Sequence, residues 1–372
     1  MSRRLTILHA IEKNRLTTGS VVQMMEAARG LAARNHRVTV AAPPGGDIER
    51  ACDDAGVAFC PMPLAGSFDV ASARILRRHL QGTLTDVTHA HKGRAHSVAL
   101  LAATGLGSRP LVVVNRGVTF PLDRFNRWKY RHPRVGAVVC VAEPVRRIVI
   151  SSGRLDPDAV RVIHGGTDVD RFDSQKIDAS GARSELGVRP DQLLVGQVSI
   201  RDWKGWRDLV EAFSLATAAS GNHRLLLVGC EPEDAGRDVA AAARRFAISD
   251  RILMQPYRRD MPEVLAACDV VVDASWAGTG ITGTIREAMA LGRPVIASDC
   301  GGNSELVIDD ECGLLVPPQH PRALAGALTR LFGDPDMRTR LGAAARQRVL
   351  AGFTTDHRIS RLETLYRELL GS

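Results

Sequence analysis

Short apolar runs alternate with amphipathic segments through the whole of this 372-residue chain. In the first half, helical periodicity is clear at residues 21–34, 68–81 and 94–104. The apolar runs that predict strands in the same half are 5–11, 36–42, 87–90, 111–115, 137–141 and 160–163. Strands that alternate with helices predict a parallel, doubly wound sheet.

The same pattern begins again after residues 164–172, and a polar stretch near 173–190 indicates a linker. Strands of the second half are expected at 193–198, 224–228, 252–254, 270–273 and 294–297. The length and this repetition predict an α/β protein of two Rossmann-like, doubly wound domains that face each other across a cleft. We place the domains at residues 1–175 and 176–353, with a C-terminal helix in 354–372 that packs back toward the first domain.

Composition favours a globular, intracellular protein. The chain is 45% hydrophobic, yet no apolar run approaches the roughly 20 residues that a membrane span needs. Its first residues predict a strand preceded by two arginines rather than a secretory signal, so we expect a cytoplasmic protein. The seven cysteines are scattered and form no C-x-x-C pair, which favours reduced thiols over a disulfide or zinc framework.

Positive charge is concentrated in the first half, where residues 1–175 hold 25 Lys+Arg against 15 Asp+Glu. Its densest part, residues 124–134, interleaves cationic and aromatic side chains. Such a surface suits anionic lipid or a phosphorylated glycan, and a solvated basic helix is the alternative interpretation. No nucleic-acid-binding motif accompanies the charge, so no nucleic-acid partner is expected.

Ligands of open α/β sheets bind outside the carboxyl ends of the strands, so the loops at those ends are candidate sites. The first candidate loop contains Gly19, with Thr18 or Ser20 as the N-cap of the next helix, although a purely structural turn also explains it. The second candidate loop places Arg201 and Lys204 after the strand at 193–198. This pair could bind a diphosphate or be ordinary surface charge.

The third candidate loop carries most of the functional information, because a glycine- and threonine-rich segment runs into a short helix. A helix N-terminus offers unpaired N–H groups and a favourable dipole to a phosphate. Glu287 follows one turn later, where its carboxylate could accept hydrogen bonds from sugar hydroxyls. The candidate donor-binding residues of this loop are Thr279, Gly280, Ile281, Thr282, Gly283, Thr284 and Glu287.

Taken in their order along the chain, the motifs of this sequence resemble those of retaining glycosyltransferases of the GT-B fold. The similar enzymes are in the family 4 group, which includes lipopolysaccharide and other cell-surface glycan enzymes. The resemblance covers nearly the whole chain. The matching segments are 5–11 with the Gly19 loop, 30–44, His89-Ala-His91, 166–172, 203–205, 226–229, 286–295, Gly301-Gly302, 334–335 and 341–342 with the closing helix.

The resemblance implies that Lys204 and Arg201 neutralise the diphosphate of a nucleotide-sugar donor and act in catalysis. In relatives the arginine stands five residues before the lysine, where this chain has Ser199, so Arg201 must substitute for it. The family also has two glutamates eight positions apart. Glu287 matches the second, which binds the ribose, whereas Thr279 occupies the place of the first, which contacts the transferred sugar.

In the first domain, many members carry a histidine after the fourth predicted strand, where this chain has Arg116. Arg116 and His91 are candidate contacts to an acceptor or a phosphate, although Arg116 could also simply cap a strand end. His89 and His91 lie on one face of a strand end, and no third ligand has a spacing that suits zinc. We therefore expect no metal and no cofactor.

The resemblance implies a metal-independent retaining glycosyltransferase that moves a sugar from a nucleotide diphosphate sugar to a cell-surface glycan or lipid-linked acceptor, such as a lipopolysaccharide core. Without a metal, cations and backbone N–H groups must stabilise the departing phosphate. The basic first domain adds a possible peripheral association with the inner face of the plasma membrane. The base, the sugar and the acceptor are not specified by the sequence.

Two other activities fit the same fold. A non-catalytic nucleotide-sugar-binding or regulatory protein would keep the nucleotide site after losing the residues that Thr279 and Arg116 replace. A nucleotide-sugar epimerase would need acid and base carboxylates around the donor sugar, and Thr279 supplies none. A phosphorylase would need a pyridoxal lysine, and no motif supports one.

Overall fold

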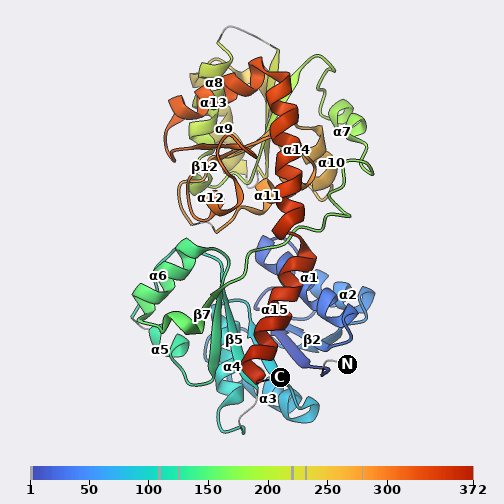
Figure 1. Ribbon diagram of the computed structural model, residues 1–372, viewed down its shortest axis with the longest axis vertical. Coiled ribbons are helices and arrows are strands. Elements are labelled where there is room, and N and C mark those ends of the chain that lie inside the picture. Colours follow the sequence, from blue (N-terminus) through green and yellow to red (C-terminus); the bar gives the residue numbers. More distant parts are fainter. Residues whose placement is uncertain are drawn as a thin grey trace. The chain divides into compact units, whose positions relative to one another are not determined.

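The computed structural model describes residues 3–107, 110–124, 126–218, 222–230, 233–278 and 280–371. They form two compact units, which are shown in Figure 1. Unit 1 consists of the chain up to Gly166 together with the segment from Thr355 onward, and unit 2 is Thr167–Thr354. Each unit contains one wholly parallel sheet, so the predicted fold class of two Rossmann-like α/β domains is confirmed.

The sheet of unit 1 has seven strands in the order β3-β2-β1-β4-β5-β6-β7. Its strands are β1 (Thr6–Ala10), β2 (Arg37–Ala42), β3 (Ala58–Pro61), β4 (Val87–Ala90), β5 (Leu111–Arg116), β6 (Val135–Cys140) and β7 (Val160–Val162). Its helices are α1 (Gly19–Ala33), α2 (Asp47–Asp54), α3 (Val70–Thr83), α4 (Gly93–Ala103), α5 (Arg127–Tyr130), α6 (Glu143–Gly153), α15 (Thr355–Leu370) and the 3-10 helix η1 (Pro157–Ala159).

The last helix, α15, packs beside α1 in unit 1 (Figure 1). Its apolar side chains Ile359, Leu362 and Leu365 are buried in the same core as residues of α1, β1 and β2. Tyr366 is fully buried, and its hydroxyl lies 2.6 Å from Nδ1 of His89 in β4. A segment some 200 residues distant from the rest of the unit therefore completes its core.

The sheet of unit 2 has six strands in the order β10-β9-β8-β11-β12-β13. Its strands are β8 (Leu193–Val198), β9 (His223–Val228), β10 (Ile252–Gln255), β11 (Val270–Asp273), β12 (Val295–Ser298) and β13 (Leu314–Val316). Its helices are α7 (Ala179–Glu185), α8 (Trp206–Ala216), α9 (Glu233–Arg245), α10 (Met261–Ala267), α11 (Gly283–Ala290), α12 (Asn303–Leu306), α13 (Pro321–Gly333), α14 (Pro335–Gly352), η2 (Asp202–Lys204) and η3 (Ser249–Arg251).

The structure differs from the predicted elements mainly at the sheet edges. The edge strands β3 and β13 were not predicted, because exposed Ala58 and Pro61 interrupt the apolar pattern of β3 and because β13 is a three-residue run between Gly313 and Pro317. The stretch near 173–190 was interpreted as a linker, but it contains α7, whose N-cap Asp178 accepts hydrogen bonds from the N–H groups of Ser180 and Gly181. This helix packs against α10 in unit 2.

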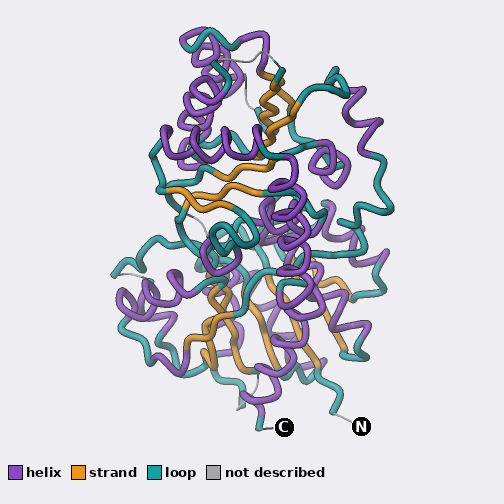
Figure 2. The backbone as a smooth tube through the Cα atoms, turned by 45° about the horizontal axis from the view of Figure 1, so that its top comes forward, coloured by secondary structure: helices purple, strands orange, loops and turns teal. Residues whose placement is uncertain are grey.

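Figure 2 shows the strands of each unit running side by side with helices around them. Among the described helices, none is long and apolar enough to cross a membrane.

Candidate functional site

The strand order of unit 2 reverses between β8 and β11. The loops that leave these neighbouring strands therefore diverge, and such a switch point forms a crevice at the carboxyl edge of a parallel sheet. Lys204 lies in the loop that follows β8, and Asp273 is the last residue of β11. The structure thus places a lysine and a carboxylate at this switch point.

Asp273 binds four other side chains at this edge of the sheet. Its carboxylate accepts hydrogen bonds from the Lys204 ammonium at 3.3 Å, the Ser275 hydroxyl at 2.8 Å, the Thr282 hydroxyl at 2.8 Å and the Asn303 amide at 3.1 Å. Burial by itself would raise the pKa of Asp273, but Lys204 and the three neutral donors outweigh it and lower the pKa. The carboxylate is therefore ionised and holds Lys204 beside the loop that precedes α11.

Three further contacts join the loops after β8 and β11. The amide of Gln197 donates to the Lys204 carbonyl and accepts from the N–H of Ala274. Gly205 has a φ of +65°, and a Cβ there would lie 1.9 Å from the carbonyl oxygen of Ala274. The N–H of Trp276 donates to the carbonyl of Trp203 at 2.9 Å. Only glycine fits at position 205, and the backbone around Lys204 is consequently fixed.

The N-terminus of α11 is held by the same group of residues. Thr282 is the N-cap, and its N–H donates to the Asn303 side-chain oxygen while its hydroxyl donates to Asp273. Thr282 thus stabilises the loop, and its N–H already has an acceptor within the protein. Among the described residues, no partner accepts from the N–H groups of Gly283 and Thr284, which lie in the first turn. These two are the donors that the helix presents to a ligand.

Glu287 lies one turn into α11, and its Oε1 would be 3.8 Å from a Cβ built on Gly283. Burial raises the pKa of Glu287, and the charges of Arg286 and Arg171 offset this only in part. Arg286 is itself buried and donates from Nε to the Thr167 hydroxyl at 2.8 Å. The Glu287 carboxyl thus lies close to Gly283 in the first turn of the helix.

The other predicted donor contacts have less distinctive surroundings. Arg201 is exposed and its guanidinium lies over the ring of Trp203, 5.3 Å from the centroid. The carbonyl of Gly280 accepts a hydrogen bond from the N–H of Gly302, and Ile281 packs against the core of unit 2. Thr279 lies outside the described residues.

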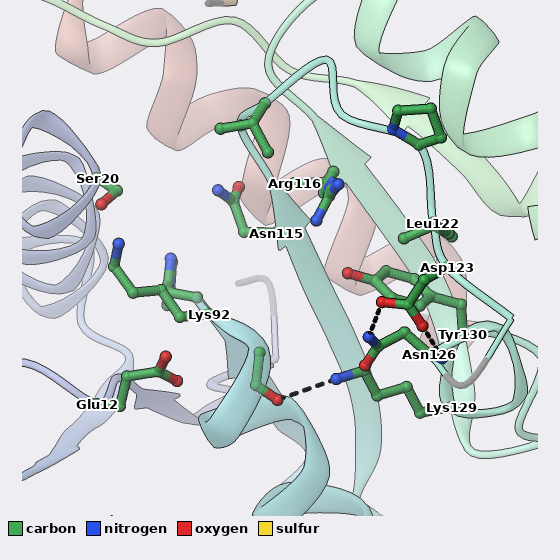
Figure 3. Close-up of a pocket in the computed structure, with 15 residues that line it drawn as sticks. Glu12, Ser20, Lys92, Asn115, Arg116, Leu122, Asp123, Asn126, Lys129 and Tyr130 are labelled. Carbon is green, nitrogen blue, oxygen red and sulfur yellow. Dashed lines mark hydrogen bonds between the residues drawn. The ribbon is translucent and has the colours of Figure 1, made fainter. Parts of the chain in front are cut away.

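The strand order of unit 1 reverses between β1 and β4, and a pocket of about 560 Å³ lies beside this second switch point (Figure 3). Two of the predicted acceptor or phosphate contacts, His91 and Arg116, line this pocket. Gly19 begins α1 next to Ser20, which also lines it. A Cβ at Gly19 would meet nothing within 4 Å, so the fold itself does not require glycine there.

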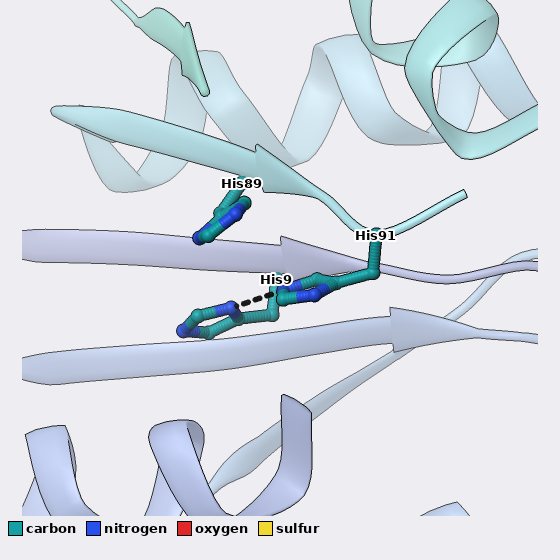
Figure 4. Close-up of side chains that lie close together, drawn as sticks. All are labelled: His9, His89 and His91. Carbon is teal, nitrogen blue, oxygen red and sulfur yellow. Dashed lines mark hydrogen bonds between the residues drawn. The ribbon is translucent and has the colours of Figure 1, made fainter. Parts of the chain in front are cut away.

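His9, His89 and His91 form a buried cluster in unit 1 (Figure 4). The parallel register sets His9 in β1 beside His89 in β4, and Nδ1 of His9 lies 2.9 Å from Nε2 of His91. Burial lowers the pKa of all three, to about 3 for His9, and Arg358 adds to the effect. The rings are therefore neutral near pH 7.

Metal ligation is one possible use of this cluster. The nearest ligand atoms of the three histidines lie within 4.8 Å of one another, so the cluster supplies the third ligand that the sequence interpretation did not find. The buried guanidinium of Arg358 opposes a second cation there, and His89 already bonds to Tyr366. Hydrogen bonds to His91 and Tyr366 use one ring nitrogen each of His9 and His89, and Nε2 of both is buried without a hydrogen-bond partner among the described residues.

Two parallel Rossmann-like units in one chain define the GT-B fold, and solved structures of this fold match nearly the whole chain. A glycosyltransferase from Rickettsia africae superposes with a TM-score of 0.87 at 19% identity, over 99% of each chain. Anabaena Alr3699/HepE, solved with UDP-glucose, gives a TM-score of 0.83 at 21% identity, over 97% of this chain and 99% of that one.

Family comparisons assign both units to glycosyltransferase domains. Residues 17–171 match the family described as Glycosyltransferase Family 4, and residues 189–334 match the one described as Glycosyl transferases group 1. A D-inositol 3-phosphate glycosyltransferase of Nocardia farcinica is 33% identical over 63% of this chain and 52% of the relative. The chain therefore spans about half the length of this curated relative. These matches support a glycosyltransferase of the GT-B fold.

Sequence reasoning had singled out Lys204, Thr282 and Glu287 but not the residues that position them. Asp273, Gln197 and Asn303 were missed. Asp273 and Gln197 gave a signal, because each is a polar residue at or near the end of an otherwise apolar buried strand.

We predict that Asp273→Asn lowers the free energy of unfolding of unit 2 by about 3 kcal/mol, because it leaves the largely buried Lys204 ammonium without its carboxylate. Urea unfolding followed by tryptophan fluorescence reports on this, since Trp203, Trp206 and Trp276 all lie in unit 2. Because the pKa of Asp273 is lowered in the fold, its contribution is present above about pH 4 and is lost in stronger acid. The variant should lack this part of the acid sensitivity.

The control for this prediction is Asp299→Asn, at an exposed carboxylate that follows β12. Equal stability of the two variants at pH 7 would contradict the role given to Asp273.

Proposed function

We propose that the protein is a retaining glycosyltransferase that takes a sugar from a nucleoside diphosphate sugar and transfers it to a cell-surface glycan or lipid-linked acceptor, such as a lipopolysaccharide core. The observation that carries donor binding is the meeting of Lys204 and the N-terminus of α11 at Asp273. One cation and two free N–H groups at a switch point suit a diphosphate. The solved complex of Anabaena Alr3699/HepE with UDP-glucose supports this class of donor.

The chemical task of the site is to stabilise the charge that develops on the departing phosphate. Lys204 has three N–H donors, and the contact with Asp273 uses one of them. The N–H groups of Gly283 and Thr284 add fixed donors that need no reorganisation. Each well-placed donor of this kind typically contributes about 3 kcal/mol to the transition state. Arg201 supplies a further, exposed cation in the same loop.

Glu287 is proposed to bind the ribose of the donor. A carboxylate that accepts from two neighbouring hydroxyls fixes the orientation of the nucleoside. Burial raises the pKa of Glu287, and hydroxyl donors would stabilise its charged form. The position of Thr279 is proposed to contact the transferred sugar, with a hydroxyl in place of the carboxylate of relatives.

We propose that the reaction retains the anomeric configuration and uses no metal. The acceptor would attack from the face that the phosphate leaves, and the phosphate would assist removal of the acceptor proton. Lys204, Arg201 and the α11 N–H groups would stabilise the charge on the departing phosphate, as a bound cation does in metal-dependent enzymes. Activity is then expected to survive chelation with EDTA.

Incubation of the full chain with a panel of nucleotide sugars and glycan acceptors tests the proposed transfer. Lys204→Ala should lower kcat roughly 100-fold, because it removes a transition-state donor. Glu287→Gln should weaken UDP binding roughly tenfold, because a charged hydrogen-bond acceptor is replaced by a neutral one.

The control is Lys176→Ala, at an exposed lysine of the same unit, which should leave both quantities unchanged. Nucleotide binding without turnover for every donor and acceptor would instead support the non-catalytic alternative, in which Thr279 marks the loss of activity.

A peripheral membrane association is proposed for the basic segment at residues 124–134, together with Phe120 shortly before it. Phe120 is 56% exposed and Trp128 is 49% exposed, and Arg124 and Arg131 are exposed in the same stretch. Lys129, between them in sequence, is instead buried. The described residues of the segment thus include two aromatic rings and two arginines that are exposed to solvent, a composition that suits an anionic lipid surface.

Liposome sedimentation tests this association. Arg124→Gln/Arg131→Gln should weaken binding to vesicles with anionic lipid roughly tenfold or more, because each arginine near such a surface contributes about 1 kcal/mol. The charge-matched control is Arg322→Gln/Arg361→Gln, at exposed arginines elsewhere. Equal binding to neutral and anionic vesicles, unchanged by salt, would remove the membrane proposal.

A further inference from the structure

The pocket at the switch point of unit 1 is lined by three cationic side chains, those of Lys92, Arg116 and Lys129, and by the carboxylates of Glu12 and Asp123. Its volume of about 560 Å³ is in the range of small-molecule sites. His91 lines the same pocket but is neutral, because burial lowers its pKa. The charged lining therefore carries a net charge of +1.

Both carboxylates are already engaged by other groups. Glu12 accepts hydrogen bonds from the N–H groups of Arg94 and Ala95, at 2.7 and 3.0 Å, and so caps α4. Asp123 accepts from both the backbone and the side chain of Asn126. Both carboxylates thus bind groups of the protein that form the wall of the pocket.

The three cations, by contrast, lack carboxylate partners. Within the described part of the chain, no ion pair within 4.0 Å involves Lys92, Arg116 or Lys129. Lys129 is only 5% exposed, and its ammonium donates to the carbonyl of Gly93, which leaves two of its three donors available. The Arg116 guanidinium donates to the carbonyl of Phe120, and its buried Nε has no hydrogen-bond partner.

Holding these cations together has an electrostatic cost. Burial lowers the pKa of Lys92 and of Lys129. The charge of Glu12 opposes the shift in both, and that of Asp123 also opposes it in Lys129. Arg116 lowers the pKa of Lys129 further. An anion that entered the pocket would relieve this cost, because buried charges are favourable only when they are paired.

Neutral polar groups surround the cations. Figure 3 shows Ser20, Lys92, Asn115 and Arg116 around the same open space. The side-chain oxygen of Asn115 is buried without a hydrogen-bond partner. It could accept a hydrogen bond from a hydroxyl, and the Ser20 hydroxyl could donate or accept one.

We propose that this pocket binds the acceptor through an oxyanion, a phosphate or a carboxylate carried on a sugar or polyol, which Lys92, Arg116 and Lys129 hold while Asn115 and Ser20 bind its hydroxyls. This assignment rests on the proposed function only in calling the ligand the acceptor. The anion site itself follows from the pocket.

Calorimetric titration of the full chain, without any donor, tests the site with glucose 6-phosphate, glucuronate and glucose. At least one of the two anionic sugars should bind more tightly than glucose, and the comparison between them distinguishes a phosphate from a carboxylate site. Arg116→Gln and Lys92→Gln should each weaken binding of that sugar roughly tenfold or more, since each removes a charged hydrogen bond. Lys92 is partly exposed, so its variant remains informative if a change at buried Lys129 impairs folding.

The charge-matched control is Arg147→Gln, at an exposed arginine of the same unit, which should bind as the wild type does. Lys204→Ala should also leave this binding intact, which separates the pocket from the candidate donor site. Equal affinity for glucose and both anions, or wild-type affinity in both pocket variants, would overturn the proposal. Anion binding that depends on the pocket cations, without transfer from any donor, would uphold the site and reject the proposed transferase activity.

Discussion

The contact between Asp273 and Lys204 is the interaction on which the candidate donor site depends. A carboxylate buried at the end of β11 requires a cation and several hydrogen-bond donors, and here they come from three segments: Lys204 after β8, Ser275 and Thr282 between β11 and α11, and Asn303 in α12. Satisfying Asp273 therefore brings the loop after β8, the loop before α11 and the start of α12 to one place. The positions of Lys204 and of the free N–H groups of α11 follow from this one requirement.

The candidate sites of both units lie at the same kind of position in their sheets. In each sheet the polar side chains gather where the strand order reverses, between β1 and β4 in unit 1 and between β8 and β11 in unit 2. The two sites differ in how their charges are compensated. Lys204 has a carboxylate at 3.3 Å, whereas Lys92, Arg116 and Lys129 line a pocket whose carboxylates cap a helix or bind Asn126. The first arrangement positions a cation, and the second leaves cations available for a ligand.

Much of the fold could be predicted from the sequence, because most strands are apolar runs bounded by turns and the helices between them are amphipathic. The edge strands β3 and β13 could not, since exposed residues interrupt the apolar pattern of β3 and β13 is a three-residue run between Gly313 and Pro317. Lys204 and Glu287 were identified from a loop and a helix start, which are local signals. Asp273 and Asn303 act through contacts that span up to 69 residues, and His9 meets His91 across 82 residues. Such contacts depend on strand order, which the spacing of residues along the chain does not specify.

We propose that Asp273 acts on the nucleotide through Lys204. A double-mutant cycle on UDP affinity, with Asp273→Asn, Lys204→Gln and the double variant measured by calorimetry, tests it most directly. The account predicts a coupling of at least about 1 kcal/mol, because the carboxylate cannot position an ammonium that has been removed. Losses of affinity that simply add in the double variant would show that the two residues act independently and would contradict the account.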